Sequence, residues 1–557
     1  MKRPGEVAKG IASWLAGQVT EHGFPARTFY GESFAIWLWS LFPGEFVREI
    51  DALLPRALWQ LKREDIQAHP EFNLFALLNY CRTQGLSPED VIHAFPPLRN
   101  TANSNWILLG TLDRLLWNRL TGKRQFPETL LRLHAYLLLL LQQQKDGLIR
   151  DDRLFARWLP VPFPFSKGGR FGIRYVARLR RMSLQYHCFS LALLWDICQL
   201  AGWIGLKEAV ERGAMALLLF VLPNGDTLYL GRGQQQIFGY AALLYTLAAL
   251  SNYFSKQGIE RPWQRIWNFV SLYQRSAGSF PLVLRHGEYD YPHTVDTSDP
   301  RWLGWYSYNN YFDYLPFLGV YLAQTAALIS RPKPKVSPVW IKRPEQELVV
   351  TRRYAVIRKA NWQATVAAPY GAISHDQPIP YLCLGGKSVL PCFGGEECSP
   401  SSYNLSMLPL PYFVHRNGQP VYLRSVMSWS LSQGKSPRTL TLRGRCRWAS
   451  FERIYTWDAC EFVMKDTLQL LESRQDLEAF PLVFAAFQLD RRTDGSYRIY
   501  SNMPDLVLRL QGVEGQLETI PGMSPVGLTQ VLRERLFWDR KSEYMFHRVM
   551  HLSWARG

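Results

Sequence analysis

A tyrosine–histidine pair with an arginine-rich approach is the first candidate for chemistry. Tyr186 and His187 open an apolar segment within "GIRYVARLRRMSLQYHCFSLALL" (172–194). A free tyrosine, with a pKa of about 10, is a poor base at neutral pH. Cations such as Arg181, and the positive end of a helix, favour the phenolate, and the same cations would bind an acidic substrate. A phenol tuned in this way can take a proton and return it, so Tyr186 is a candidate general acid and base.

The same stretch also has a purely structural interpretation. A tyrosine and a histidine in the first turn of a buried helix need no function, and a motif this short does not decide between the two. His187 is then a core residue. In the functional interpretation it assists Tyr186, as a base or by holding the phenolate.

An amide followed by an indole is the second candidate, in "NTANSNWILLG" (100–110). Asn103 and Ser104 are typical helix caps. In the functional interpretation the Asn105 carboxamide binds a carboxyl group, and Trp106 stacks beside it on a sugar ring.

A glycine-rich turn that leads into three glutamines is the third candidate, in "PNGDTLYLGRGQQQ" (223–236). It lacks the ending of a P-loop and the last glycine of a dinucleotide fingerprint. It is either a plain hairpin turn or a substrate loop. In a substrate loop, Arg232 clamps a carboxylate and Gln234 contacts a hydroxyl.

Two further stretches carry candidate ligand-binding side chains. In "RWLGWYSYNNYFDY" (301–314), Trp305, Tyr308 and Asn309 either close a core or line a sugar-binding cleft. His375 and Asp376 lie in "GAISHDQPIPYLCLGG" (371–386). They are either structural residues of a turn, a tuned acid, or a weak candidate pair of metal ligands. No close-spaced His or Cys completes a zinc pattern, so we expect no cofactor, with a structural Zn or Ca as the less favoured option.

These residues fall on two parts of the chain that differ in periodicity. Residues 1–330 read as serial helices, several of them apolar on more than one face and therefore buried. Residues 331–347 form a linker rich in proline and charge. Residues 348–557 alternate with a period of two, as half-buried strands do. Helices followed by strands predict an α+β multidomain chain with segregated domains, the second an antiparallel β-sandwich.

Composition limits the choice of partner. The net charge of +18 favours an anionic partner, and the 14% of aromatic residues suits packing and sugar stacking alike. The basic residues are scattered, which weakens a nucleic-acid interpretation based on charge alone. No signal peptide is apparent, and the longest apolar runs are well short of the roughly 20 residues of a membrane span. We therefore expect a cytoplasmic protein, with export by another route left open.

Together these motifs resemble those of the heparinase II/III-like polysaccharide lyases. "DGLIRDD" (146–152), followed by Ser-x-x-Tyr-His at 183–187, looks like the family's segment with the catalytic tyrosine. "NSNWILLG" (103–110) is similar to the helix start that carries the carboxyl-neutralising asparagine. The resemblance implies an N-terminal incomplete (α/α) toroid joined to a C-terminal antiparallel β-sandwich. Of the family's His-x-His-x-Asp motif, the chain keeps only His375 and Asp376.

The resemblance also implies a reaction, β-elimination at a uronic acid of an anionic polysaccharide. Neutralising the carboxylate stabilises the negative charge that develops when the C5 proton leaves. On this analogy Asn105 and Arg232 neutralise the carboxylate and Tyr186 transfers the protons. His187 or His375 assists Tyr186.

Three rival functions remain open. A glycoside hydrolase on the same toroid needs two carboxylic acids facing the cleft, and no pairing is visible among the candidates. A catalytically silent protein for polysaccharide binding or exopolysaccharide assembly fits an unexported chain. A nucleic-acid binder has charge alone in its favour. The candidate acids are Asp146, Asp151, Asp152, Asp226 and Asp313.

Overall fold

The computed structural model describes most of the helical part and, with more gaps, the strand part. The described residues of the first part are 2–63, 69–98, 103–150, 183–231, 235–251, 256–284 and 311–330. Those of the second part run from 347 to 554, without 352, 360–361, 369–380, 386, 389–411, 416–419, 423–426, 472–476, 481, 487–488, 500–505, 512–515, 522–527 and 534–544.

Six helices of the N-terminal part form a closed ring. Each helix packs against the next one in chain order, and the last returns to the first. The ring brings together residues that lie almost 300 positions apart in the sequence. Its members are α2 (Gly31–Ser40), α4 (Pro70–Gln84), α6 (Ser104–Thr121), α9 (Leu184–Ala201), α11 (Ile237–Ser251) and α13 (Tyr311–Ser330).

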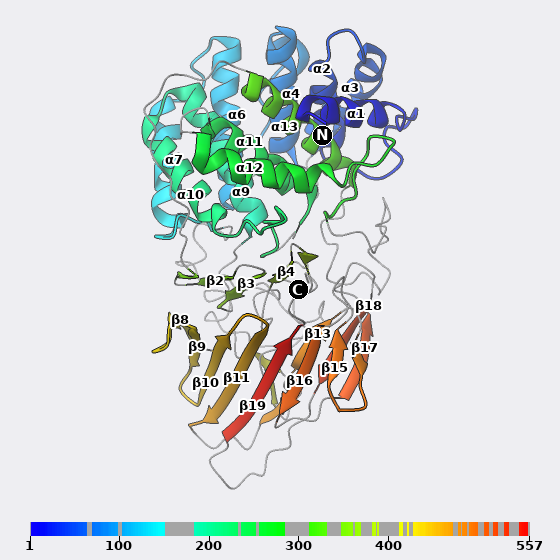
Figure 1. Ribbon diagram of the computed structural model, residues 1–557. Helices are drawn as coiled ribbons and strands as arrows, with labels where there is room; N and C mark the ends of the chain where they lie inside the picture. The colour runs from blue at the N-terminus through cyan, green and yellow to red at the C-terminus, as the bar shows by residue number, and fades with distance from the viewer. Residues whose placement is uncertain are drawn as a thin grey trace.

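A further helix precedes each member of the ring and packs on the outside (Figure 1). Residues at the starts of all six ring helices lie around one end of the ring and residues from their later turns around the other, so all six ring helices point the same way. Their N-termini therefore meet at one end of the ring and their C-termini at the other. The outer helices are α1 (Pro4–Ala16), α3 (Val47–Leu61), α5 (Pro88–Val91), α7 (Glu128–Gln142), α10 (Ile204–Leu218) and α12 (Lys256–Ser271).

Burial explains the composition of the two layers. The ring helix α11 is buried at every residue from Ile237 to Leu250, whereas the outer helix α3 buries only one face. The ends of α9 follow its sequence: Ser183 caps the start, and Gly202 ends the helix at a φ of +70°. The prediction of all-round apolar, buried helices is confirmed.

The C-terminal part consists of antiparallel strands, as predicted. One sheet has five strands in the order β1-β2-β3-β4-β5, and a larger one has eight in the order β14-β15-β16-β19-β11-β10-β9-β8. Two three-stranded sheets have the orders β12-β6-β7 and β13-β18-β17. The strands are β1 (Leu348–Val350), β2 (Tyr354–Arg358), β3 (Trp362–Ala367), β4 (Tyr381–Leu384), β5 (Lys387–Ser388), β6 (Tyr412–His415), β7 (Pro420–Tyr422), β8 (Ser428–Gln433), β9 (Thr439–Arg445), β10 (Ala449–Trp457), β11 (Glu461–Leu470), β12 (Leu477–Phe480), β13 (Leu482–Ala486), β14 (Leu489–Arg491), β15 (Tyr497–Ile499), β16 (Val507–Gln511), β17 (Gln516–Pro521), β18 (Leu528–Arg533) and β19 (Met545–Ser553).

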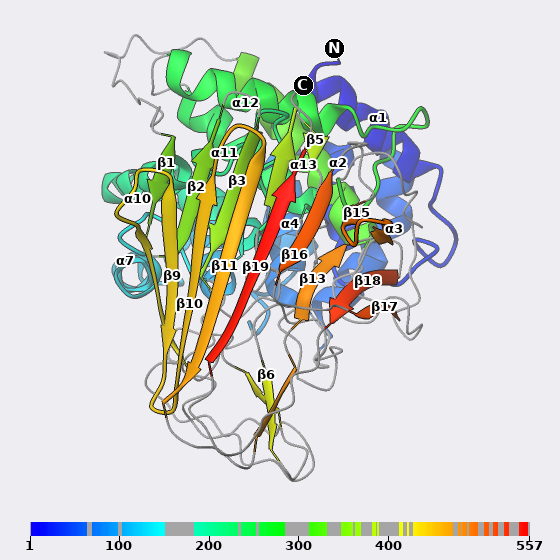
Figure 2. The same cartoon turned by 60° about the horizontal axis from the view of Figure 1, so that its bottom comes forward.

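The five-stranded sheet is the middle layer of the molecule. Along β2, Tyr354 and Val356 join the core of the helices, whereas Ala355 and Ile357 join a core shared with the eight-stranded sheet. This alternation follows from the period of two along a strand. Figure 1 shows β2, β3 and β4 between the helices and the large sheet, and Figure 2 looks onto that large sheet.

One ring helix resembles a membrane span by length and composition alone. Among the described residues only α13 is long and apolar enough, and 67% of its apolar window is buried within the structure. It packs against α1, α2 and α11, so its apolar residues are accounted for by the core of the ring.

Candidate active site

A cavity of about 190 Å³ lies at the end of the ring where the helix N-termini meet. We call it the N-terminal cavity. Its wall receives side chains from the starts of all six ring helices or from the residues just before them. Nine of its lining residues are aromatic and the other two are asparagines: Tyr30, His69, Phe72, Asn103, Asn105, Trp106, Tyr186, Phe189, Phe238, Tyr314 and Phe317.

Asn105 is the most unusual group in this wall. It is the second residue of α6, which begins at Ser104 after the cap residue Asn103. The side chain is 1% exposed, and neither its amide oxygen nor its amide nitrogen has a hydrogen-bond partner among the described residues. Leaving a buried polar group unpaired costs about 1–3 kcal/mol. An amide held in this state at a cavity wall is prepared to bind a ligand.

Tyr186 lies in the same wall, in the first turn of α9. The Ser183 hydroxyl accepts a hydrogen bond from the Tyr186 backbone N–H at 3.4 Å and so fixes this turn. The Tyr186 ring packs 5.4 Å from the Phe238 ring of α11, measured between centroids. Its position in the first turn places Tyr186 near the positive end of the helix dipole.

Trp106 completes the group of predicted residues around the cavity. It is partly exposed, and its ring lies 5.2 Å from the rings of both His69 and Phe72. The structure thus brings Asn105, Trp106 and Tyr186 to one cavity, although about eighty residues separate the first from the last. Aromatic walls of this kind suit the apolar faces of sugar rings.

His187 lies outside the described wall of the N-terminal cavity, and its assisting role stays a prediction. Its side chain is fully buried; Nδ1 accepts from the Ile149 N–H at 2.9 Å, and Nε2 lies 3.1 Å from the Gly213 carbonyl oxygen. With Nδ1 accepting, Nε2 carries the proton and donates it. Burial lowers the pKa of His187 to about 4. The neutral imidazole therefore ties α9 to α10 and to the turn at Ile149, and it does not line the cavity.

Two further polar residues line the N-terminal cavity and were not predicted from the sequence, His69 and Tyr30. His69 precedes α4, and its ring lies 5.8 Å from the ring of Tyr30. Burial, followed by the negative charge of Asp313, raises the pKa of Tyr30, which therefore stays a neutral phenol. Neither residue belongs to a motif; each precedes a helix by one position, which is the only signal that could have identified them.

The electrostatics at this end of the ring favour an anion. Six helix N-termini converge there, each carrying a partial positive charge. No carboxylate is among the lining residues that the structure describes. Asp226 and Asp313 are both buried elsewhere in hydrogen-bond networks, and Asp146 accepts from the Leu148 N–H.

The remaining predicted site residues lie outside the described part of the chain. Arg232 and Gln234 precede Gln235, which is described. Gln235 has a φ of +56° and donates hydrogen bonds to Asp226 and Tyr381. The predictions for these positions stay predictions: Arg181, Arg232, Gln234, Trp305, Tyr308, Asn309, His375, Asp376, Asp151 and Asp152.

The expectation of no cofactor, with a structural Zn or Ca as the less favoured option, likewise stays a prediction. In the described ranges, no group of three or more His, Cys, Asp or Glu side chains is arranged to hold a metal ion. His375 and Asp376 fall outside those ranges. The six described cysteines, including Cys188 of α9, form no disulfide.

Comparison with known proteins finds similarity only among solved structures, at low identity. No protein-family model and no curated protein matches it. Similar solved structures include a heparinase III (10% identity, TM-score 0.34, covering 87% of this chain and 76% of that one). A polysaccharide lyase has 13% identity and a TM-score of 0.38, and the match covers 59% of this chain and 99% of that one. A GH76A α-1,6-mannanase from Salegentibacter has 14% identity and a TM-score of 0.39, and the match covers 59% of this chain and 100% of that one. The structural neighbours thus include the lyases that the sequence resemblance indicated, together with glycoside hydrolases.

Proposed function

We propose that this chain is a polysaccharide lyase that cleaves a uronic-acid-containing anionic polysaccharide by β-elimination. One observation carries the proposal: the unpaired, buried carboxamide of Asn105 and the phenol of Tyr186 line the same cavity. The proposed architecture is an (α/α) toroid followed by a β-sandwich. It is supported by the ring of six inner helices with outer helices and by the two sheets that share a core.

In the proposed reaction the uronate carboxylate faces Asn105. The amide N–H group donates to a carboxylate oxygen and so stabilises the negative charge that develops when the C5 proton is removed. The positive ends of the six helices act in the same direction. Buried donors of this kind contribute more than they do in water, because the surrounding dielectric constant is low.

Tyr186 then moves the protons. As a phenolate it takes the C5 proton, and the electron pair of the C5–H bond forms the C4–C5 double bond. The C4–O bond to the neighbouring sugar breaks, and the leaving oxygen takes the proton back from Tyr186. The products are an unsaturated uronate end and a new hydroxyl end. His69, rather than His187, is the histidine placed to assist, because it lines the cavity.

Ultraviolet spectroscopy tests this function directly. The protein is incubated with a panel of uronic-acid polysaccharides, and absorbance of the conjugated unsaturated uronate is followed. We expect a signal with at least one polymer, and a loss of at least about 100-fold in rate for Tyr186→Phe. Tyr136→Phe, which changes a tyrosine of the outer helix α7, is the matched control and should retain full activity.

The rival functions give different outcomes in the same assay. New reducing ends without ultraviolet absorbance would identify a hydrolase. That outcome requires a pair of carboxylic acids, and the described wall of the N-terminal cavity contains none. Binding to a polymer without either product would identify a silent binding protein.

A further inference from the structure

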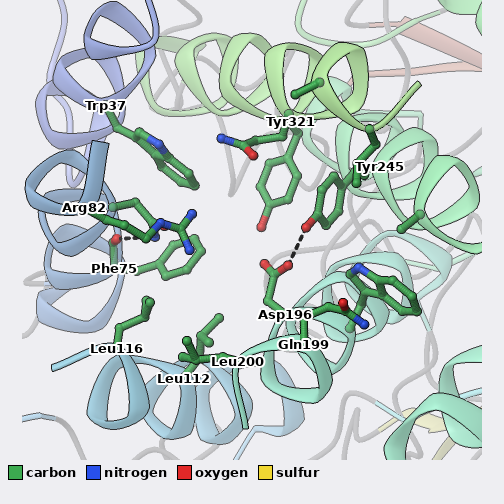
Figure 3. Close-up of a pocket in the computed structure, with 16 residues that line it drawn as sticks. Trp37, Phe75, Arg82, Leu112, Leu116, Asp196, Gln199, Leu200, Tyr245 and Tyr321 are labelled. Atoms are coloured by element: carbon green, nitrogen blue, oxygen red, sulfur yellow. Dashed lines mark hydrogen bonds between the residues drawn. The ribbon is translucent and has the colours of Figure 1, made fainter. Parts of the chain in front are cut away.

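A second and larger pocket opens at the opposite end of the ring, where the helix C-termini meet (Figure 3). We call it the C-terminal pocket. Its volume is about 580 Å³, within the range of roughly 300–1,000 Å³ that is usual for small-molecule sites. All six ring helices contribute to its wall.

The two cavities are separated along the ring axis. Tyr186 in the first and Asp196 in the second are ten residues apart on α9, which corresponds to about 15 Å along a helix. Phenylalanine rings fill the space between them. Phe317 lines the N-terminal cavity and contacts the Tyr321 ring of the C-terminal pocket, with 4.6 Å between centroids, and Phe34 packs 5.2 Å from Phe317. The C-terminal pocket is therefore not a subsite of the proposed catalytic cavity.

A carboxylate and a phenol define the polar side of this pocket. Asp196 accepts a hydrogen bond from the Tyr245 hydroxyl, and burial raises the pKa of Asp196 to about 6. Tyr321 is 1% exposed, and its hydroxyl has no hydrogen-bond partner among the described residues. Figure 3 shows the Tyr321 hydroxyl and the Asp196 carboxyl group directed into the same space. A buried hydroxyl without a partner implies a group that completes it.

The remaining polar side chains offer both donors and acceptors. Burial is the main influence on the pKa of Asp196 and raises it, whereas the positive charge of Arg82, in the last turn of α4, acts against that rise. The charges of Arg82 and Asp196 therefore oppose each other across the pocket. Gln199 of α9 and Gln324 of α13 add carboxamides, each with a donor and an acceptor end. A ligand in this pocket must therefore both donate and accept hydrogen bonds, as hydroxyl groups do.

Aromatic side chains supply the apolar side. Trp37, Phe75 and Trp195 line the pocket together with the rings of Tyr245 and Tyr321. Flat rings beside a set of mixed donors and acceptors match a sugar, which presents C–H faces and hydroxyl edges. The C-termini of six helices carry partial negative charge and disfavour an anionic ligand such as a uronate.

We propose that the C-terminal pocket is a binding site for a neutral sugar of one or two rings. Because the charges of Arg82 and Asp196 oppose each other, the pocket does not need a charged ligand. The unpartnered Tyr321 hydroxyl marks the position where a hydroxyl group of the sugar binds. This site is independent of the proposed lyase activity.

Saturation-transfer NMR and calorimetry on the full chain test the proposal without turnover. The probes are methyl glycosides of glucose, mannose and galactose, with maltose and cellobiose, and tetramethylammonium as a cationic probe. We expect at least one neutral sugar to bind with a Kd below about 10 mM. Tyr321→Phe and the partly exposed Gln324→Ala should each weaken binding about threefold to tenfold, the usual effect of one hydrogen bond. Asp196→Asn, which keeps an acceptor, should reduce binding by less than tenfold.

Control variants decide which cavity is occupied. Asn105→Ala, in the N-terminal cavity, should leave sugar binding unchanged. The proposal is overturned if no neutral sugar binds, or if binding is lost in Asn105→Ala but unaffected by Tyr321→Phe and Gln324→Ala. Tighter binding of tetramethylammonium than of any sugar, abolished by Asp196→Asn, would also overturn it, since the pocket would then be a cation site.

Discussion

Asn105 combines a stability cost with a proposed function, and a single substitution separates the two. Leucine has a similar size and no polar atoms, so Asn105→Leu removes the unpaired amide from the wall of the N-terminal cavity. We expect the free energy of unfolding to rise by about 1–2 kcal/mol. The rate of elimination should fall about 100-fold to 1,000-fold, as when a donor to a developing anion is removed.

Chemical denaturation and the ultraviolet assay measure these two effects on the same samples. Asn118→Leu serves as the control, because the Asn118 amide nitrogen is paired with the Phe126 carbonyl oxygen at 2.7 Å. This variant should lose stability and keep its activity. A loss of stability in Asn105→Leu would show that the amide is paired in the folded chain and would remove the basis of its assigned role.

His187 makes the stability of the chain depend on pH. Its folded-state pKa of about 4 lies below the usual histidine pKa of about 6.5, so the unfolded chain binds the proton first as the pH falls. Its contribution to stability is therefore complete above about pH 6.5 and is lost as the pH falls toward 4. The difference in pKa corresponds to about 3 kcal/mol.

Comparing wild type with His187→Gln isolates this contribution. Asp313, whose pKa burial raises to about 7, shifts stability in the opposite direction over the same range, so only the difference between the proteins is informative. The denaturation midpoints of wild type and His187→Gln, measured at a series of pH values, should converge as the pH falls from 6.5 to 4. A constant difference between the two proteins would mean that His187 does not titrate in this way.

At the scale of the elements, Asp313 closes the ring. Its carboxylate, at the start of α13, accepts from the backbone N–H groups of Phe29 and Tyr30 at 3.0 and 2.9 Å, just before α2. The backbones are so close here that a Cβ on Gly31 would lie 2.2 Å from the Phe312 carbonyl oxygen. The first and last ring helices thus meet through an acidic side chain that serves as the N-terminal cap of a distant helix.

Removing this carboxylate should weaken ring closure. Asp313→Ala leaves the Phe29 and Tyr30 N–H groups without their acceptor, which should lower the free energy of unfolding by about 2–4 kcal/mol. Asp146→Ala, which removes a local bond to the Leu148 N–H in a partly exposed turn, should cost less than about 1 kcal/mol. Equal effects of the two variants in chemical denaturation would contradict the role given to Asp313.

Local features of the elements could be predicted, and long-range ones could not. Ser183 and Gly202 bound α9 through their own conformational preferences, which act within one helical turn. The cap that Asp313 provides for α2 depends on a contact across 284 positions, and no periodicity encodes it. The same holds for Tyr30 and His69, which reach the cavity only because the ring closes.

At the scale of the whole molecule, ring closure also determines which of the predicted site residues lie together. Asn105 and Tyr186 each open a helix, and helices that run in the same direction in a ring present their starts at one end. The sequence therefore predicts the residue types at that end but not their spacing. His187 differs from Tyr186 by one position, about 100° around the helix, and this alone turns it from the cavity toward α10.

Strand β4 joins the sheets to the ring, and this contact should make the molecule unfold as one unit. The Tyr381 hydroxyl donates to the buried carboxylate of Asp226, which also accepts from Tyr240 at 2.5 Å. The Tyr381 ring stacks on Tyr229 at 4.1 Å between centroids, and the Tyr229 hydroxyl lies 2.8 Å from Thr365 of β3. These residues form one continuous polar and aromatic contact between the two parts of the chain.

Scanning calorimetry of Tyr381→Ala tests this coupling. Losing a buried aromatic ring costs about 3–5 kcal/mol, and here the loss falls on the contact between the two parts. We expect a single transition for the wild type and two for Tyr381→Ala, since each part keeps its own core. Arg443→Ala, on the exposed face of the large sheet, should leave the single transition in place. If Tyr381→Ala still unfolds in a single transition, merely at lower temperature, the two parts are coupled by contacts other than this one.

Activity gives an independent readout for the proposed lyase. Gln235 donates hydrogen bonds to Asp226 and Tyr381 and lies three positions after Arg232 in the sequence. Losing Tyr381 should therefore raise the KM for the polymer more than it lowers kcat.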